Sequence, residues 1–567
     1  MIPVDVETGS TRGAWTSVSV AWIAGLAALV VWLSITPAAV LRDELKVLQP
    51  WWLDACALLG VLICVCAVPR VARTSLRRGS APAVCLMGLA LCLTVFVAPR
   101  TNRIFYDEQI YESVGQNLSD LRRAQVCNDG TVASGRLHCA DGEYNKQPYA
   151  YPHVLSLAYR VAGVHEWVAF AVNALAMALT TAAVYLLALV LFHDRRSAFF
   201  AGLLFALMPQ QIVWSATAAV EPTASLAAVA AVLAAAIYER SGSVLTLIAL
   251  TVSAAYAVQF RPESLLVLPV VAAVAWPRLR VDLRRPRGWW SAVLFLGLTA
   301  AHVAHLFAVR HINWGTDGPR FSLAYVAANL RTNAGFFVWD ERFPVVCTAL
   351  ALAGLMGVSR KRERWTLAAY FALFFGVDLV FYAGSYNYGA DVRYSLMTYP
   401  PAAILGGVGA AAASRWLARR MPKVPAPGVV AAVLLFQFLW YAPSVRAVTE
   451  EAWAARADVR FARDFASRLP MDSYVLTQNP GMFQVWGVSA GQMSRAVASP
   501  NYTAWLVRQH PGGVYVHWNF WCNVQEPSQP ELCRRALALG RTALAAEYRE
   551  RDQRFAFYRL LPEALNP

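Results

Sequence analysis

Residues 167–192 read WVAFAVNALAMALTTAAVYLLALVLF and contain no charged side chain. A helix needs about 20 apolar residues to cross the hydrocarbon core of a bilayer, so this stretch predicts a membrane-spanning helix. The composition agrees, because 57% of the 567 residues are hydrophobic and only 15% are charged. A soluble protein carries about 25% charged residues. The sequence therefore predicts an integral membrane protein.

About thirteen apolar runs fit this length requirement, which predicts a mostly α, polytopic membrane fold. Their predicted extents are 17–40, 53–68, 81–98, 167–192, 198–216, 223–238, 244–260, 264–276, 289–309, 343–358, 365–382, 394–413 and 428–441. The first run follows two acidic residues, Asp5 and Glu7, and is longer than the apolar core of a signal peptide. We therefore expect it to remain in the mature chain as the first helix.

Basic residues are concentrated in alternate loops between these runs, as in residues 70–78, 278–287 and 360–364. Cytoplasmic loops of membrane proteins carry an excess of Lys and Arg, so these loops and the N-terminus are predicted to be cytoplasmic. The net charge of +15 then reflects membrane topology, and a nucleic-acid partner is not expected. The same topology places residues 100–165 and the tail after residue 443 outside.

Two domains are predicted. Residues 1–443 form the membrane domain, including the outer loop 100–165, and residues 444–567 form an extracytoplasmic domain. Residues 472–477 and 512–517 have the character of strands, which favours a small α/β fold for the tail. The aromatic side chains of Trp518, Phe520 and Trp521 suit the core of this domain, with an acceptor platform as the alternative.

Four cysteines lie in the predicted outer segments, as the local pairs Cys127 with Cys139 and Cys522 with Cys533. An oxidising exterior permits a disulfide within each pair. A zinc site is the weaker alternative, because neither pair has the short spacing that zinc ligands favour. We therefore expect two disulfides.

The outer loop contains the clearest functional signal, RIFYDEQIYESVGQNL at residues 103–118. Asp107 and Glu108 would open an amphipathic helix with an apolar stripe at i, i+4 and i+8 from Ile110. Such a helix is expected to lie along the membrane surface, with Asp107 and Tyr111 on another face. Ordinary helix capping is the alternative explanation, because acidic residues favour the first turn of any helix.

Three further charged residues lie near predicted outer helix ends. Glu221 directly precedes Pro222 and an apolar run, Arg261 precedes another run, and Lys146 lies in the segment EYNKQPYAYP. Helix N-termini and basic side chains suit a phosphate group. A carboxylate beside them suits deprotonation of an acceptor hydroxyl. These residues therefore indicate phosphate-dependent group transfer at the outer surface.

The segment YDEQIY at residues 106–111 resembles the acidic first-loop motif of the GT-C glycosyltransferases, in particular the protein O-mannosyltransferase and lipid A aminoarabinose transferase group. The segment KQPYAYP at 146–152 resembles their Lys-or-His-Pro-Pro segment, with Gln147 in place of a proline. The segments VEP at 220–222 and DVRY at 391–394 are similar to two later motifs. The resemblance spans residues 100–409 and implies a GT-C membrane fold with an outer C-terminal domain.

The resemblance also implies an activity. The protein would be an inverting glycosyltransferase of the cell envelope, acting on a cell-wall glycan, a lipid or a protein. It would move one hexosyl or pentosyl unit from a polyprenyl phosphate in the membrane to an outer hydroxyl.

Residue roles follow from the same resemblance. Asp107 would be the general base and Glu108 would orient the acceptor or the sugar. Lys146 and Arg393 would hold the departing phosphate, and Glu221 would bind sugar hydroxyls or a divalent cation, the one cofactor candidate. The remaining predicted substrate-binding residues are Tyr111, Tyr149, Arg261 and Tyr394.

Two other functions remain alternatives. A multi-pass secondary transporter would show internal repeats and polar groups at mid-membrane, whereas no clear repeat of the halves is present. A ligase or an oligosaccharyltransferase would use a glycan on a lipid pyrophosphate. The sequence contains no Trp-Trp-Asp motif of the kind typical of oligosaccharyltransferases, and polysaccharide ligases usually centre on a large arginine-rich outer loop late in the chain.

Overall fold

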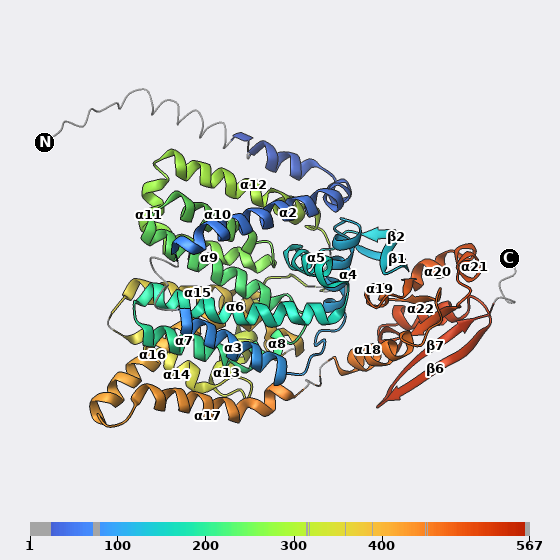
Figure 1. The fold of residues 1–567 in the computed structure, drawn as a ribbon. Coiled ribbons are helices and arrows are strands. Elements are labelled where there is room, and N and C mark those ends of the chain that lie inside the picture. The colour runs from blue at the N-terminus through green and yellow to red at the C-terminus, as the bar shows by residue number, and fades with distance from the viewer. Residues whose placement is uncertain are drawn as a thin grey trace.

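A computed structural model describes residues 24–25, 27–71, 80–312, 316, 318–357, 359–387, 389–447, 450 and 452–561. The helices form one body, and the C-terminal domain projects from one end of it (Figure 1). Residues 17–23 and 26 of the predicted first helix, 17–40, and most of the predicted basic loop 70–78 lie outside the described residues.

The helical body is built from the apolar runs. Its elements are α2 (Ala38–Val71), α3 (Ser80–Phe96), α6 (Glu166–Phe192), α7 (Arg195–Ala206), α8 (Pro209–Ser215), α9 (Glu221–Ser241), α10 (Val244–Ala257), η2 (Pro262–Leu266), α11 (Val267–Asp282), α12 (Pro286–Ala308), η3 (Leu323–Tyr325), α13 (Val326–Val338), α14 (Val345–Met356), α15 (Lys361–Val380), η4 (Gly389–Thr398), α16 (Tyr399–Arg420) and α17 (Ala426–Arg446). Every predicted run from 53–68 onward coincides with one of these helices or with a consecutive pair.

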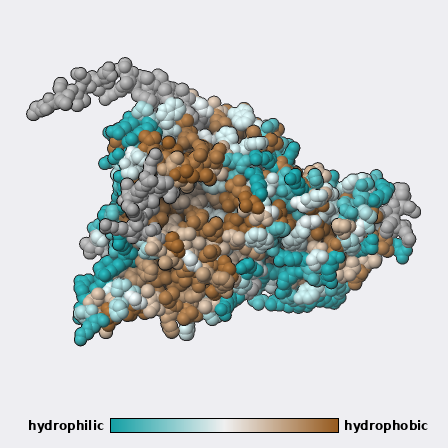
Figure 2. Space-filling view, viewed as in Figure 1, coloured by the Kyte–Doolittle hydropathy of each residue, from teal (hydrophilic) through white to brown (hydrophobic). Residues whose placement is uncertain are grey.

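Seven of the described helices are long and apolar enough to cross a membrane, or eight if α7 and α8, bent by 57°, form one span. Three further apolar helices are shorter, at residues 81–96, 244–257 and 345–356. Hydrophobic residues gather over the middle of the helical body, and hydrophilic residues cover its left edge and the C-terminal domain (Figure 2). The polytopic membrane fold is thus confirmed, whereas the number thirteen stays a prediction.

Small residues let the central helices pack at close range. A side chain at Gly354 of α14 would place its Cβ 1.9 Å from the carbonyl oxygen of Leu405 in α16, and Gly409 of α16 stands equally close to Leu350. Glycine at such positions allows helix backbones to touch, as is common between membrane helices. This packing fixes α16, whose outer end carries η4 and part of the site.

The C-terminal domain contains a sheet that extends beyond the tail. Its strands are β1 (Val126–Ala133), β2 (Arg136–Glu143), β3 (Tyr474–Thr477), β4 (Ser489–Gln492), β5 (Val514–Trp518), β6 (Thr542–Glu550) and β7 (Gln553–Leu560), in the order β2-β1-β4-β3-β5-β7-β6. Strand β3 pairs in parallel with β4 and β5. The predicted α/β character is confirmed, because helices α18 (Trp453–Ala466) to α22 (Ser528–Leu537) accompany these strands.

The outer loop supplies two of the seven strands. The hairpin β1–β2 joins the sheet where Asp129 pairs with Gly491 and Gly130 with Ala490. Two strands from before the predicted domain boundary at residue 443 therefore belong to the same sheet as the strands after it. The edge of a hairpin has free backbone groups that can pair with many strands, and the sequence does not indicate which strand is the partner.

Helix α4 (Asp107–Asp120) forms where the acidic segment predicted it, and ten of its residues are buried, whereas its position along the membrane surface stays a prediction. It is buried on its polar side as well, between α5 (Ala150–Ala162) and α19 (Pro480–Val485). A Cβ at Gly115 would lie 3.0 Å from Leu155 of α5, and a Cβ at Gly481 of α19 would lie 2.6 Å from Ser113. The C-terminal domain thus covers part of the polar face of α4.

Both predicted disulfides are present. Cys127 is bonded to Cys139 across the hairpin β1–β2, and Cys522 is bonded to Cys533, which lies in α22. Each disulfide lies in the outer part of the structure, where the predicted topology places an oxidising environment.

Candidate active site

Asp107 is the first residue of α4, where the helix dipole favours a negative charge. Its side chain is 43% exposed to solvent, so a substrate can reach the carboxylate. Oδ2 of Asp107 lies 3.5 Å from Nη2 of Arg393 in η4. An accessible carboxylate beside a fixed positive charge has the arrangement that a general base requires.

A chain of ion pairs continues from Asp107 into the protein. Nε of Arg393 lies 3.1 Å from Oε1 of Glu221, the almost completely buried first residue of α9. The same oxygen of Glu221 pairs with Arg261, which also pairs with Glu263 at the start of η2. Three carboxylates and two guanidinium groups from four elements therefore meet at the ends of α4, α9, η2 and η4.

The ring of Tyr394 lies against both arginines. The guanidinium carbon of Arg261 is 4.9 Å from the ring centre, and that of Arg393 is 5.1 Å from it. Cation–π contacts of this kind hold a guanidinium group in a fixed orientation. Tyr394 thus holds two guanidinium groups side by side, and guanidinium groups suit the binding of a phosphate group.

Tyr111 lies one helical turn after Asp107 and its ring packs edge-on against Tyr151, with 5.6 Å between centres. Burial raises the pKa of Tyr111 well above its ordinary value, and the carboxylates of Asp107 and Glu221 raise it further. The hydroxyl therefore remains protonated and can act as a hydrogen-bond donor beside the ion pairs.

Glu108 is placed differently from the predicted role. Its Oε1 accepts hydrogen bonds from the backbone N–H groups of Arg103, at 2.6 Å, and Ile104, at 3.0 Å. Its Oε2 accepts a third from the N–H of Ala218, at 2.8 Å. Burial raises the pKa of this carboxyl to about 7, although the backbone donors oppose the shift. Glu108 thus ties the start of α4 to the segment before Glu221, and this geometry favours positioning over contact with an acceptor.

Lys146 and Tyr149 lie in the loop between β2 and α5. The Tyr149 hydroxyl is buried, accepts the N–H of Asn145 at 2.7 Å and lies 3.1 Å from the carbonyl oxygen of Ala124. Tyr149 therefore stabilises the loop, in contrast to its predicted contact with substrate. Lys146 is half-buried in the same loop. The N–H of Ala150 donates to the carbonyl oxygen of Gln259, which brings this loop beside the segment that carries Arg261.

A buried network that no sequence pattern indicated lies directly behind Asp107. The hydroxyl of Tyr106 donates to Oδ2 of Asp458 in α18, and Oδ1 of Asp458 lies 2.9 Å from Nε2 of His517 in β5. The N–H of Phe520 donates to the same carboxylate at 3.2 Å. The rings of Phe520 and Trp521 also pack on Tyr106, at 6.3 and 6.0 Å. These two aromatic residues therefore pack against the core of the C-terminal domain, as the sequence suggested, and also contact Tyr106 of the outer loop.

No group of three or more His, Cys, Asp or Glu side chains with metal-site geometry occurs among the described residues. The carboxylate of Glu221 lies instead against two arginines. The predicted divalent cation therefore stays an untested prediction.

Comparison with known proteins supports the fold. Residues 146–305 match the family model for dolichyl-phosphate-mannose-protein mannosyltransferase. No curated protein sequence matches the chain.

Solved structures align over most of the chain. The structure of ArnT from Cupriavidus metallidurans bound to undecaprenyl phosphate aligns with a TM-score of 0.54 and 15% identity, covering 85% of this chain and 98% of that one. The apo structure of the same protein aligns with a TM-score of 0.52, the same identity and the same coverage. These likenesses confirm the fold expected from the motifs: the chain has the fold of the GT-C membrane glycosyltransferases.

Proposed function

We propose that the protein transfers a single sugar from a polyprenyl phosphate to an acceptor hydroxyl outside the membrane. The observation that carries this proposal is the accessible carboxylate of Asp107, held 3.5 Å from Arg393 beside a second arginine, Arg261, at the helix ends of a GT-C fold. The undecaprenyl phosphate bound by the similar ArnT supports a donor of this chemical type.

The transfer would proceed in one displacement. Asp107 accepts the proton of the acceptor hydroxyl while the oxygen forms a bond to the anomeric carbon. The bond from that carbon to the phosphate oxygen breaks, and its electron pair leaves with the polyprenyl phosphate. Arg393 and Arg261 stabilise the growing phosphate charge in a site largely shielded from water. Attack opposite the leaving group inverts the anomeric centre.

The orientation in the membrane is part of the proposal. Asp107, Glu221 and Arg261 meet through ion pairs at the starts of α4, α9 and η2, and α4 contacts α19 of the C-terminal domain. The loops rich in arginine lie toward the opposite helix ends, which favours a cytoplasmic position for them. The site and the C-terminal domain would then face the exterior, where the acceptor is a lipid, a glycan or a protein.

The test is transfer in reconstituted vesicles. A panel of polyprenyl-phosphate sugars is supplied with envelope extracts as acceptors, and release of free polyprenyl phosphate is followed for the wild type and Asp107→Asn. Loss of a general base slows turnover by about a hundred- to ten-thousandfold. Asp464→Asn is the matched control, because Asp464 is an exposed carboxylate, paired with Arg468, on the outer domain.

The outcomes separate the alternatives. Release from one donor class, lost in Asp107→Asn and kept in Asp464→Asn, supports the proposal and identifies the sugar. If Asp107→Asn releases polyprenyl phosphate as fast as the wild type, Asp107 has no part in the mechanism. Release only from lipid pyrophosphates carrying a whole glycan would favour a ligase or an oligosaccharyltransferase.

A further inference from the structure

A cavity of about 280 Å³ lies at the opposite end of the helical body from Asp107. Helix α9 is 21 residues long, begins with Glu221 in the candidate active site and ends at Ser241. At 1.5 Å per residue this helix is about 30 Å long, which is the thickness of the hydrocarbon core. Arg240 of α9, which lines the cavity, therefore lies at the other membrane surface.

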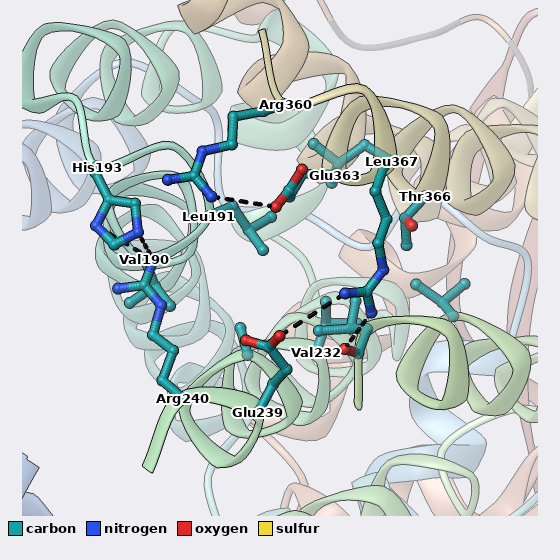
Figure 3. A pocket seen from close by; sticks show the side chains of 14 residues that line it. Val190, Leu191, His193, Val232, Glu239, Arg240, Arg360, Glu363, Thr366 and Leu367 are labelled. Carbon is teal, nitrogen blue, oxygen red and sulfur yellow. Dashed lines mark hydrogen bonds and ion pairs between the residues drawn. The ribbon is translucent and has the colours of Figure 1, made fainter. Parts of the chain in front are cut away.

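The cavity has two kinds of wall. Apolar side chains of α6, α9, α11 and α15, among them Val232, Val270 and Leu367, form its inner part. Four basic side chains stand around its mouth: His193, Arg240, Arg360 and Arg362. Figure 3 shows these charged ends arranged around a central space. An apolar wall below a basic rim matches a molecule with a hydrocarbon part and an anionic end.

The basic side chains around the cavity mouth differ in whether a carboxylate neutralises their charge. Arg360 lies 3.5 Å from Glu363, and Arg362 lies 3.7 Å from Glu239. Nη2 of Arg240 instead bonds Nε2 of His193 at 2.5 Å, and among the described residues no carboxylate lies within salt-bridge distance of Arg240. The imidazole nitrogen that accepts this bond must be unprotonated, so Arg240 is held by a neutral partner.

The surroundings of His193 point the same way. Its burial, together with the positive charges of Arg240 and Arg360, lowers the pKa of His193. Arg240, Arg360 and the neutral His193 thus converge on one space, and among the described residues Arg240 has no carboxylate within salt-bridge distance. An anion placed between them would accept charge-assisted hydrogen bonds from the guanidinium groups.

The arginines are also held in place. Nη2 of Arg362 donates to the carbonyl oxygens of Ala273 and Val274 near the middle of α11, at 2.7 and 2.8 Å. Arg360 is the residue directly before α15. Because these groups are fixed by the protein, an incoming phosphate would lose less side-chain freedom than at a loose basic surface.

We infer that this cavity binds an anionic phospholipid, with the phosphate among Arg240, Arg360 and His193 and part of one acyl chain along the apolar wall. Basic pockets between membrane helices on the cytoplasmic side recognise acidic lipid headgroups in this way. The site is separate from the transfer site and does not depend on the proposed enzyme activity. In the proposed topology it faces the cytoplasmic leaflet.

The experiment measures lipid binding to the purified full-length protein in detergent by native mass spectrometry. Phosphatidylglycerol is compared with phosphatidylcholine of the same acyl chains, and inorganic phosphate is measured by calorimetry. The variant Arg240→Gln with Arg360→Gln removes two rim charges. Arg420→Gln is the matched control, because Arg420 is an exposed arginine at the end of α16 and does not line the cavity.

A third variant, Ala236→Phe, fills the apolar part of the cavity without changing its charges. It separates a lipid from a free phosphate, and it remains informative if the rim variant fails to fold. We expect phosphatidylglycerol to bind at least tenfold more tightly than phosphatidylcholine. The rim variant should lose this preference, Ala236→Phe should weaken phosphatidylglycerol binding, and Arg420→Gln should keep wild-type binding.

Three results would overturn the inference. The first is equal binding of the two lipids by the wild type. The second is an equal loss of binding in the rim variant and in Arg420→Gln, which would indicate a diffuse surface effect. The third is inorganic phosphate that binds as tightly as phosphatidylglycerol with no effect of Ala236→Phe, which would identify a free-anion site.

Discussion

The hydrogen bond from Tyr106 to Asp458 should control the position of the neighbouring Asp107, and Tyr106→Phe removes this bond alone. Asp458 is completely buried and accepts hydrogen bonds from Tyr106 and Phe520, with His517 as its third partner. A hydrogen bond to a charged group contributes about 1.5–3 kcal/mol. If this energy keeps Asp107 in place, its loss raises the barrier for transfer, and kcat should fall about ten- to a hundredfold.

Tyr474→Phe is the control for this prediction. The hydroxyl of Tyr474 donates to Oδ1 of Asp129 at 2.5 Å, so it also forms a buried Tyr–Asp bond between the C-terminal domain and the outer loop. This bond joins β3 to β1 in the sheet and does not adjoin Asp107. Both variants should lower the thermal unfolding midpoint by a similar amount, whereas only Tyr106→Phe should lower kcat.

The assay is donor turnover in vesicles at several acceptor concentrations, with thermal unfolding measured on the same preparations. A positioning role predicts a lower kcat with little change in KM. Equal kcat losses in the two variants would show that the interface acts on stability alone. An unchanged kcat in Tyr106→Phe would refute the reasoning, because Asp107 would then be held without this bond.

Three other changes test separate parts of the structure. Burial and nearby carboxylates raise the pKa of Glu112 well above its ordinary value, so the folded chain keeps a proton that the unfolded chain releases. The free energy of unfolding should then fall by up to about 1.4 kcal/mol per pH unit as the pH rises above about 4.5. The variant Glu112→Gln should show a smaller fall, which thermal unfolding measured between pH 5 and 8 would detect. Replacing Cys522 and Cys533 by serine should lower the free energy of unfolding by about 2–3 kcal/mol, because the lost disulfide closes a short loop. A variant that unfolds like the wild type in both reducing and oxidising buffer would contradict this. Gly354→Ala should lower the free energy of unfolding by about 1–3 kcal/mol, because its Cβ would push α14 away from α16. Gly428→Ala is the control and should leave the unfolding midpoint unchanged, because open space surrounds its Cβ position.

The membrane helices were predictable because their signal is local. An apolar run such as 167–192 must cover its own backbone polar groups, and a helix does this within one segment. The start of α4 at Asp107 was predictable for the same reason, because a helix end is encoded by the residues beside it. Each of these elements depends on neighbours a few positions away.

The rest depended on contacts that the sequence separates widely. Tyr106 and Asp458 are 352 positions apart, and neither residue type indicates a buried partner. Glu108 looked like a second reactive carboxylate because its backbone partners, including Ala218, have no sequence signature. Helix α4 was expected at the membrane surface because its amphipathic pattern does not reveal which domain covers the polar side. Long-range pairing of this kind is the part that a single sequence leaves open.

The shared sheet has a consequence for how the chain is made. Strands β1 and β2 leave the ribosome more than three hundred residues before β4, their partner in the sheet. In the proposed topology the hairpin waits during that time on the far side of the membrane, with its own disulfide, Cys127–Cys139, formed and the edge that pairs with β4 still free. In that topology the C-terminal domain docks onto a template that was exported before it, and a chain truncated before residue 489 would present the free edge to any other strand in its surroundings.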